Sequence, residues 1–417
     1  MSIAYYNPSQ KIKIYITYLF LFTLISGLLV SHVPPGYRFD LIRAGILGGF
    51  FGLFFIRKRK FDYISKVILF FSAYVIIMSF VTYKNFGYFP DKSIKLLYSS
   101  IFFIIGYNVV KTTNEILYLC KVFVYGMGIV IIYIIISNVF GLGPQHVPVV
   151  HILDLEELGR NITKSLPFFI FPALLLVVQT KDIRQRNVII LIICLAILLI
   201  LIGQKRGTLL ALFFGLITYL TFSPYKISNF KISIAVAVLA FILLPYYGPY
   251  IVQTFEERQE RHSVVLTQNI AEMEREGRYL EFERTFDDLG KRGSAELLFG
   301  VGFASEHGYY NVRRMLHTDY MMFLDGTGVF GFFLYMYIFY LIFIKTFKYS
   351  QHFNNVKFVL NLRAVIFSLI IVSMFTAVSG FSHGIDLRAY FMLFAGATVG
   401  FLSQIYYDKI YFQFNIL

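Results

Sequence analysis

Residues 187–222 read NVIILIICLAILLILIGQKRGTLLALFFGLITYLTF, two apolar runs separated only by the polar tetrad Gln204-Lys205-Arg206-Gly207. A helix needs about 20 mostly apolar residues to cross a bilayer, and the two runs approach that length. Both runs are continuously apolar and lack the alternation of a β-barrel strand, so they predict helices. This stretch therefore predicts a helical hairpin in a membrane, with two cations at its tip.

Similar apolar runs recur along the whole chain. The 417 residues are 57% hydrophobic and only 15% charged, which is too apolar for a water-soluble protein. The sequence therefore predicts an all-α polytopic membrane protein with about 12 transmembrane helices. The expected spans are 14–31, 41–56, 64–82, 93–110, 116–140, 165–180, 187–203, 208–222, 232–247, 320–344, 358–379 and 389–405.

The polar segments divide the chain into three parts. Residues 1–247 are expected to hold spans one to nine, and 320–417 spans ten to twelve. Between them, 248–319 forms one large loop that is dense in charge. After Gly277 this loop carries apolar residues at helical spacings, which predicts short amphipathic helices on the surface of the bundle.

The distribution of Lys and Arg gives the orientation, because cytoplasmic loops retain these residues. With the N-terminus inside, the inner segments hold 19 of the 38 basic residues and only four of the 24 acidic ones. The inner side then carries about +15 and the outer side about −1. Both termini are therefore expected in the cytoplasm and the large loop outside. The basic residues lie scattered between apolar runs, so nucleic acid is not an expected partner.

Most acidic residues and seven of the eight histidines fall on the outer side. Any chemistry is therefore expected to be extracytoplasmic, where cytoplasmic nucleotides are poor candidates for an energy source. A group-transfer enzyme in this position would need a substrate that is activated beforehand and carried across the membrane.

Three outer-face motifs combine residues suited to chemistry. Lys205 and Arg206 sit in a hairpin with little room for a loop, where poorly solvated cations are costly unless an anion binds them. Gly277-Arg278 opens the amphipathic segment of the large loop. The glycine turn LLFGVGF (297–303) precedes LHTDYMMFLDG, in which His317 stands at the outer N-terminus of span ten. A helix N-terminus disfavours imidazolium, so His317 is expected to serve as a neutral base.

Some polar and glycine-containing motifs also have a simpler interpretation. Lys205 and Arg206 could extend to lipid phosphates instead of binding a substrate. His146 and His151 lie near carboxylates, but no zinc-type pairing is present, so metal binding is not expected. The GxGxxG spacing that begins at Gly326 falls inside a predicted membrane helix, which favours close packing over dinucleotide binding.

In this order, the motifs resemble the O-antigen ligase and O-antigen polymerase (Wzy-like) superfamily of bacterial surface-polysaccharide assembly. The resemblance covers approximately residues 160–340, less than half of the chain. Its five elements are, in chain order, the loop arginine in Gly159-Arg160-Asn161, the span RGTLLALFFGL, the Gly277-Arg278 pair, the turn FGVGF, and His317-Thr318-Asp319 entering a span with GxxG.

The resemblance implies a GT-C-like glycosyltransferase of the bacterial inner membrane that uses a glycan on undecaprenyl pyrophosphate as donor. By motif match, Arg206 and Arg278 would hold the pyrophosphate and His317 would assist the acceptor hydroxyl. A metal or other cofactor is not implied. Expected partners are the lipid-linked donor and acceptor glycans, membrane lipids, and a chain-length regulator and flippase of the same pathway.

Four further residues are candidates for substrate binding: Arg160, Lys205, Arg284 and Asp319. Arg160 could assist at the pyrophosphate or form a loop ion pair with Glu156 or Glu157. Asp319 could orient His317 or cap the helix that follows.

Two functions within the superfamily and one outside it remain open. A polymerase joins two lipid-linked glycans, whereas a ligase transfers glycan to the phosphate-rich lipid A core. The nearly neutral outer side favours the polymerase, because a ligase needs a basic face for its acceptor. A lipid-linked oligosaccharide flippase would need charges deep in the bundle, which the inner halves of the spans lack.

The predicted orientation can be tested with reporter fusions. Alkaline phosphatase fused near residue 184 should be inactive and near residue 270 active, because the enzyme works only outside the cytoplasm. Activity at 184 or its absence at 270 would overturn the assignment.

Overall fold

A computed structural model of the chain describes residues 10–30, 39–56, 59–86, 91–140, 162–203, 205–225, 277–303, 306–309, 312–316, 318–377 and 386–414. The described part is nearly all helical. Seven of its helices are long and apolar enough to cross a membrane, namely α1, α3, α5, α8, α14, α15 and α16. The prediction of an all-α membrane protein is confirmed at this level.

The first half of the described chain holds nine helical elements. They are α1 (Gln10–Val30), α2 (Phe39–Phe55), α3 (Tyr63–Phe86), α4 (Asp91–Val109), α5 (Thr113–Phe140), the 3-10 turn η1 (Thr163–Ser165), α7 (Leu166–Gln179), α8 (Ile183–Gly203) and α9 (Arg206–Phe222). The second half holds five helices and two strands. They are α12 (Gly277–Lys291), α13 (Ser294–Phe299), β1 (Glu306–Tyr309), β2 (Val312–Met315), α14 (Asp319–Gln351), α15 (Lys357–Ala377) and α16 (Asp386–Phe414).

Eleven of the twelve expected spans coincide with one of these helices, and the remaining one, 232–247, lies outside the described residues. Four of the eleven, α2, α4, α7 and α9, contain apolar stretches of 17 residues or fewer. They are therefore shorter than the about 20 residues that usually cross a bilayer.

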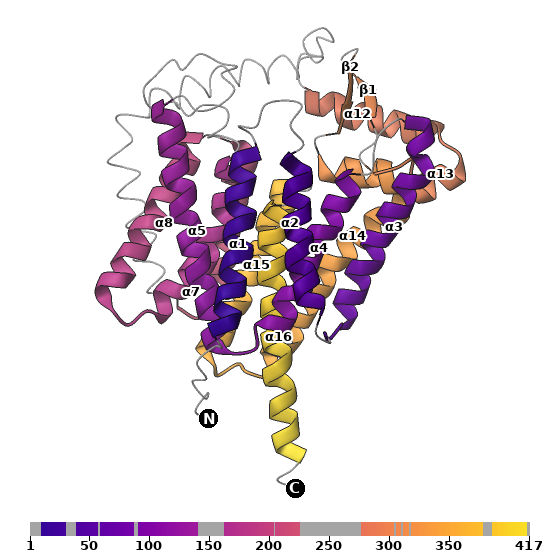
Figure 1. Ribbon diagram of the computed structural model, residues 1–417. Helices are drawn as coiled ribbons and strands as arrows, with labels where there is room; N and C mark the ends of the chain where they lie inside the picture. The colour runs from indigo at the N-terminus through magenta and orange to yellow at the C-terminus, as the bar shows by residue number, and fades with distance from the viewer. Residues whose placement is uncertain are drawn as a thin grey trace.

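The long helices form one bundle with two distinct ends (Figure 1). Helix α1 begins and α16 ends at the same end, which we call the terminal end. Helix α12 and the strands β1 and β2 lie at the opposite end, which we call the loop end (Figure 1). The start of α1 and the end of α16 are thus separated from the described part of the large loop by the length of the bundle.

The large loop differs in part from its prediction. The amphipathic helix is present as α12, in which Leu289 is buried and Phe286 is 56% exposed. The sequence did not indicate the antiparallel pair of β1 and β2, in which Glu306 faces Met315 and Tyr309 faces Val312. Strands of four residues are too short to produce a recognisable alternation of apolar and polar residues.

Aromatic side chains fill the centre of the bundle. Phe20 of α1, Phe123 of α5, Phe169 of α7 and Tyr390 of α16 contact one another, with ring centroids 4.8 to 6.5 Å apart. All four are buried. These rings join four helices that are distant in sequence, and dispersion contacts between them stabilise the arrangement.

Helices α4 and α16 approach each other through glycines. A Cβ atom added at Gly396 would overlap the carbonyl of Phe103, and one added at Gly106 would overlap the carbonyl of Leu393. Gly400 lies equally close to the carbonyl of Tyr107. Small residues allow helix backbones to pack this closely in membranes, so the three glycines fix the position of α16.

Replacing Gly396 with alanine should therefore destabilise the protein by roughly 1–3 kcal/mol, because the added methyl group must push two backbones apart. Gly49→Ala is the matched control, since its added Cβ would meet no atom within 4 Å beyond its chain neighbours and the nearby backbone of its own helix. Thermal unfolding of both purified variants in detergent measures the difference. Equal melting temperatures for the two variants would contradict the tight α4–α16 contact.

Candidate functional site

The motif helices α9 and α14 both begin at the loop end. Helix α9 runs antiparallel to α15, because Phe214 stacks on Phe375 at 4.7 Å while Ser223 hydrogen-bonds Asn361 at 3.0 Å. The start of α9 therefore lies beside the end of α15. The start of α14 lies there too, since the hydroxyl of Tyr320 donates to the carbonyl of Met374 at 2.6 Å.

The predicted site residues are described to different extents. The backbone places Arg206 as the first residue of α9 and Lys205 as its N-cap, with Lys205 partly exposed. Arg278 and Arg284 lie on α12. The side chains of Arg206, Arg278 and Arg284 lie outside the described part of the structure. All atoms of Arg160 and His317 also lie outside it, as do those of His146 and His151, where no metal site was expected.

Asp319 is the first residue of α14 and is completely buried. The N-cap of the helix is Thr318, whose side chain makes no capping hydrogen bond. Asp319 interacts electrostatically with Arg388 of α16, of which only 1% is exposed. Because both groups are buried, the attraction between their opposite charges acts between α14 and α16. The structure thus gives Asp319 a partner that neither sequence interpretation included.

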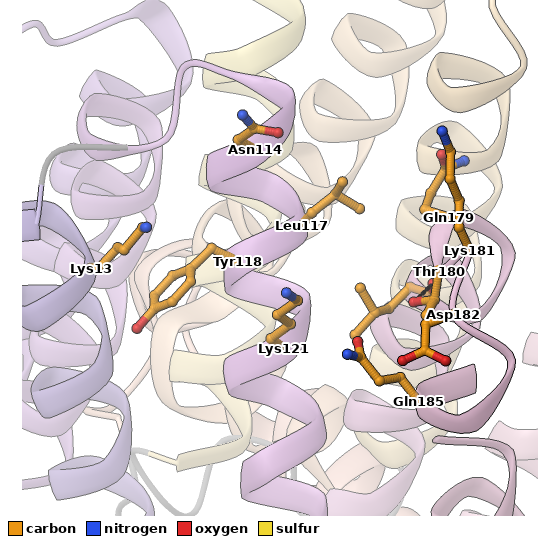
Figure 2. A pocket seen from close by; sticks show the side chains of 11 residues that line it. Lys13, Asn114, Leu117, Tyr118, Lys121, Gln179, Thr180, Lys181, Asp182 and Gln185 are labelled. Atoms are coloured by element: carbon orange, nitrogen blue, oxygen red, sulfur yellow. Dashed lines mark hydrogen bonds between the residues drawn. The ribbon is translucent and has the colours of Figure 1, made fainter. Parts of the chain in front are cut away.

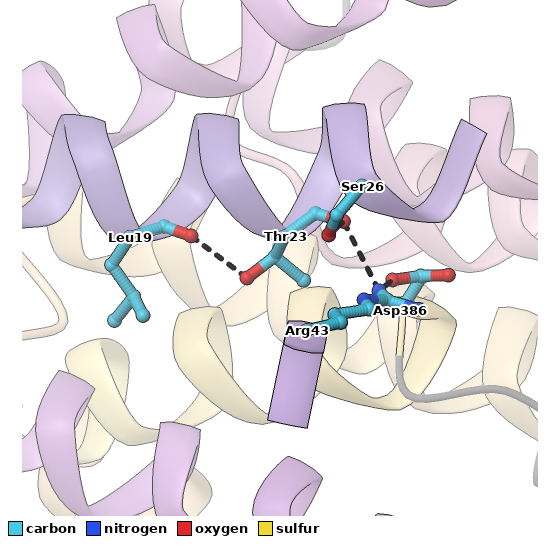
Figure 3. A network of polar contacts seen from close by, with 5 residues as sticks. All are labelled: Leu19, Thr23, Ser26, Arg43 and Asp386. Atoms are coloured by element: carbon cyan, nitrogen blue, oxygen red, sulfur yellow. Dashed lines mark hydrogen bonds and ion pairs between the residues drawn. The ribbon is translucent and has the colours of Figure 1, made fainter. Parts of the chain in front are cut away.

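Arg388 also interacts with Asp386, which forms an ion pair with Arg43 of α2 (Figure 3). The guanidinium of Arg43 also donates a hydrogen bond to the carbonyl of Thr23 in α1 at 3.2 Å. A Cβ added at Gly27 would lie 2.5 Å from a carboxylate oxygen of Asp386, so α1 leaves room for this carboxylate only because a glycine stands there. The network joins α1, α2 and α16 at the loop end.

The glycine turn docks on a kink in α14. Gly300 in the turn and Gly328 in the helix have positive φ angles of 81° and 65°, which favour glycine. The amide of Gly302 donates to the carbonyl of Gly326 at 2.9 Å, and a Cβ at Gly326 would lie only 2.7 Å from the carbonyl oxygen of Gly302. The GxGxxG spacing therefore serves close backbone packing, as predicted, although its partner is the turn 300–303.

Two side chains hold this docked turn in place. Arg292, which follows α12, pairs with the carboxylate of Asp325 and donates to its carbonyl at 3.0 Å. Tyr74 of α3 donates to the carbonyls of Thr327 at 2.7 Å and Phe299 at 3.0 Å. The side chains of Arg292 and Asp325 are 9% and 2% exposed. These contacts join the glycine turn and the end of α12 to α14 and α3 of the bundle.

Sequence reasoning overlooked Arg43, Asp386 and the Arg292–Asp325 pair. For Arg43, Asp325 and Asp386, the signal was a charged residue inside or at the edge of an apolar run, which requires a partner of opposite charge. The sequence contained that signal but not the pairing, because Arg43 and Asp386 are 343 positions apart.

The charges at the loop end determine which ligands the site can attract. Arg43 with Asp386 and Arg292 with Asp325 each sum to zero charge, so they organise the loop end and do not themselves attract an anion. The N-termini of α9 and α14 lie at the same end, and their backbone N–H groups favour negative charge there. Among the described residues, no cluster of three or more His, Cys, Asp or Glu side chains could hold a metal ion.

Comparison with known proteins adds nothing to this geometry, since no protein-family model and no curated protein matches the chain.

Breaking the buried Arg292–Asp325 pair should be costly. Asp325→Asn should lower the free energy of unfolding by about 3 kcal/mol, because it leaves a buried guanidinium without a counter-charge. Asp287→Asn on the exposed face of α12 should change it by less than about 0.5 kcal/mol. Thermal unfolding in detergent compares the two variants. A double variant, Arg292→Gln with Asp325→Asn, should recover part of the loss. Equal effects of Asp325→Asn and Asp287→Asn would contradict the pairing.

Proposed function

We propose that the protein is a polymerase of undecaprenyl-pyrophosphate-linked oligosaccharide repeat units, acting on the outer face of the bacterial inner membrane. In this proposal it is a metal-independent glycosyltransferase with a GT-C-like fold of about 12 spans and both termini in the cytoplasm. The main support for this proposal is that the motif elements lie at the same end of the bundle. The starts of α9, α12 and α14 and the glycine turn, which are up to about 110 residues apart in sequence, all belong to the loop end.

The reaction would be a displacement at the anomeric carbon of the donor sugar. A hydroxyl oxygen of the acceptor glycan forms the new bond to this carbon while the bond to the pyrophosphate oxygen breaks. The electron pair of that bond leaves with the lipid pyrophosphate, and the hydroxyl proton goes to His317. Negative charge grows on the leaving group, where Arg206 and Arg278 would hold it with charge-assisted hydrogen bonds.

The arrangement of helix ends supports an anionic leaving group at this position. Arg206 is the first residue of α9, so its backbone lies where the helix dipole is positive. Thr318 and Asp319 begin α14 beside the same end of α15. The arginine fork and the helix N-terminus would then act on one pyrophosphate without a metal.

The described charge pairs also favour an enzyme over a flippase. Arg43–Asp386 and Arg292–Asp325 lie toward the loop end, and Asp62–Lys345 lies toward the terminal end. A flippase that exposes its substrate to each side in turn needs charged groups near the middle of the membrane. Among the described residues, these charge pairs lie near the two ends of the bundle and not near its middle, which supports an enzyme over a flippase.

The catalytic assignment can be tested by complementing a deletion strain. Arg206→Ala, Arg278→Ala and His317→Ala should each reduce glycan polymerisation by about a hundredfold or more, because each removes a group needed only as charge develops. Arg206→Lys should restore little, since an ammonium cannot replace the planar fork. The readout is the surface-glycan ladder on a gel, with membrane levels of each variant checked by immunoblot.

Arg184→Ala is the matched control, because Arg184 is an exposed arginine near the start of α8 at the terminal end. It should retain the full ladder. A full ladder from Arg206→Ala or His317→Ala would contradict the mechanism.

The same deletion strain separates polymerase from ligase. Without a polymerase, lipid A core should carry a single repeat unit. Without a ligase, the core should be bare and long glycan should remain on undecaprenyl pyrophosphate. The second pattern would replace the polymerase with the ligase in this proposal.

A further inference from the structure

A cavity lies at the terminal end of the bundle, far from the candidate site. It has a volume of about 370 Å³ and lies where α1, α5 and the α7–α8 connection meet (Figure 2). Its lining includes Lys13 near the start of α1, Lys121 of α5 and Lys181 between α7 and α8. No step of the proposed glycosyl transfer uses these residues.

The cavity is positively charged and rich in hydrogen-bond donors. Its lining contains the three lysines and one acid, Asp182, whose carboxylate accepts a hydrogen bond from the amide of Arg184 at 2.9 Å. The amide side chains that line it are those of Asn114, Gln179 and Gln185. Figure 2 shows Lys121 between Lys13 on one side and Lys181 with Asp182 on the other. Such a lining favours an anion with several acceptor oxygens.

Part of this lining is held in place by contacts of its own. The hydroxyl of Tyr118 shares a hydrogen bond of 2.7 Å with Thr17, which fixes α5 against α1. The ammonium of Lys13 lies 5.7 Å from the centre of the Tyr118 ring. The hydroxyl of Thr180 donates to the carbonyl of Leu176 at 2.8 Å and so secures the end of α7. The cavity therefore belongs to the packed bundle.

Apolar surface continues from the cavity along the outside of the helices. Tyr125, one turn beyond Lys121 on α5, is 65% exposed. Val188 and Leu191, one and two turns beyond Gln185 on α8, are 56% and 59% exposed. In a membrane protein these side chains face acyl chains. A ligand with an anionic head and hydrocarbon chains fits both the cavity and this apolar surface.

We propose that this cavity binds the phosphate-bearing headgroup of an anionic phospholipid, with Lys13, Lys121 and Lys181 as its cationic ligands. The acyl chains follow the exposed apolar side chains of α5 and α8. Basic pockets between helices at the cytoplasmic face attract acidic headgroups, and each nearby lysine adds to the affinity. The lipid would link α1 to the α7–α8 connection.

The test uses the purified full-length protein in neutral detergent. Its melting temperature is followed while phosphatidylglycerol, zwitterionic phosphatidylethanolamine or inorganic phosphate is added. Phosphatidylglycerol should raise the melting temperature, and phosphatidylethanolamine should have little effect. In the triple variant Lys13→Gln, Lys121→Gln and Lys181→Gln, the phosphatidylglycerol concentration for half of the effect should rise about tenfold or more.

A second triple variant controls for general loss of charge. Lys66→Gln, Lys348→Gln and Lys357→Gln remove three exposed lysines from the same end of the bundle without touching the cavity. This variant should respond to phosphatidylglycerol like the unaltered protein. Equal weakening in both triple variants would overturn the proposal, because it would indicate attraction to the whole face.

The phosphate arm identifies the source of the anion. If inorganic phosphate alone stabilises the protein as well as phosphatidylglycerol does, and the effect requires the three cavity lysines, the ligand is a soluble phosphate compound and the lipid assignment is wrong. Native mass spectrometry gives an independent readout that does not depend on stability. It should show retained phosphatidylglycerol in the unaltered protein and less in the cavity variant, and equal retention in both would also overturn the proposal.

Discussion

The need to pair buried charges is the constraint on which the loop end of this protein depends. A buried guanidinium or carboxylate is stable only beside a partner of opposite charge. Arg43 therefore has to meet Asp386, and Arg292 has to meet Asp325. The first pair ties α2 to α16 and the second ties the end of α12 to α14. Because each pair joins two different elements, the requirement for pairing helps to fix which elements are neighbours.

Glycines make these pairings possible by letting backbones come close. Gly27 leaves space for the carboxylate of Asp386 on α1, and Gly326 and Gly328 let the glycine turn lie directly on the kinked α14. Further along α16, Gly396 packs against the backbone of α4. Helix α16 is thus held by close contact on one face and by ionic contact at its start. The start of α14, where His317 precedes Asp319, is positioned by the same set of contacts.

The two ends of the bundle differ in how their charges are used. At the loop end, Arg43 and Arg292 are paired with carboxylates. The motif arginines on α9 and α12 would then serve a substrate pyrophosphate. At the terminal end, three lysines line a cavity that contains one acid. In the proposed orientation, an activated glycan would react outside while an anionic lipid is held inside, and both proposals rest on phosphate chemistry at opposite membrane faces.

Much of the fold could be predicted from sequence because membrane helices obey a one-dimensional rule. Continuous apolar runs such as 187–203 and 358–379 had to become helices, since only internal hydrogen bonds satisfy a backbone in hydrocarbon. The amphipathic segment after Gly277 and the packing role of Gly326 were also legible, as local spacing decides both. The short strands β1 and β2 were missed, because four residues carry too little periodic signal.

Only the tertiary structure decided which charged residues lie close to one another. The sequence contained Asp319 and Arg388 but offered a cap or a histidine as the partner of the aspartate, and it gave no reason to connect Arg43 with Asp386. It also left Lys13, Lys121 and Lys181 as three separate loop and helix-end cations, whereas folding brings them around one cavity. Apolar periodicity acts along the chain and can be read from it. Charge pairing acts across space between residues that can be 343 positions apart, as Arg43 and Asp386 are, so it is set only when the helices pack.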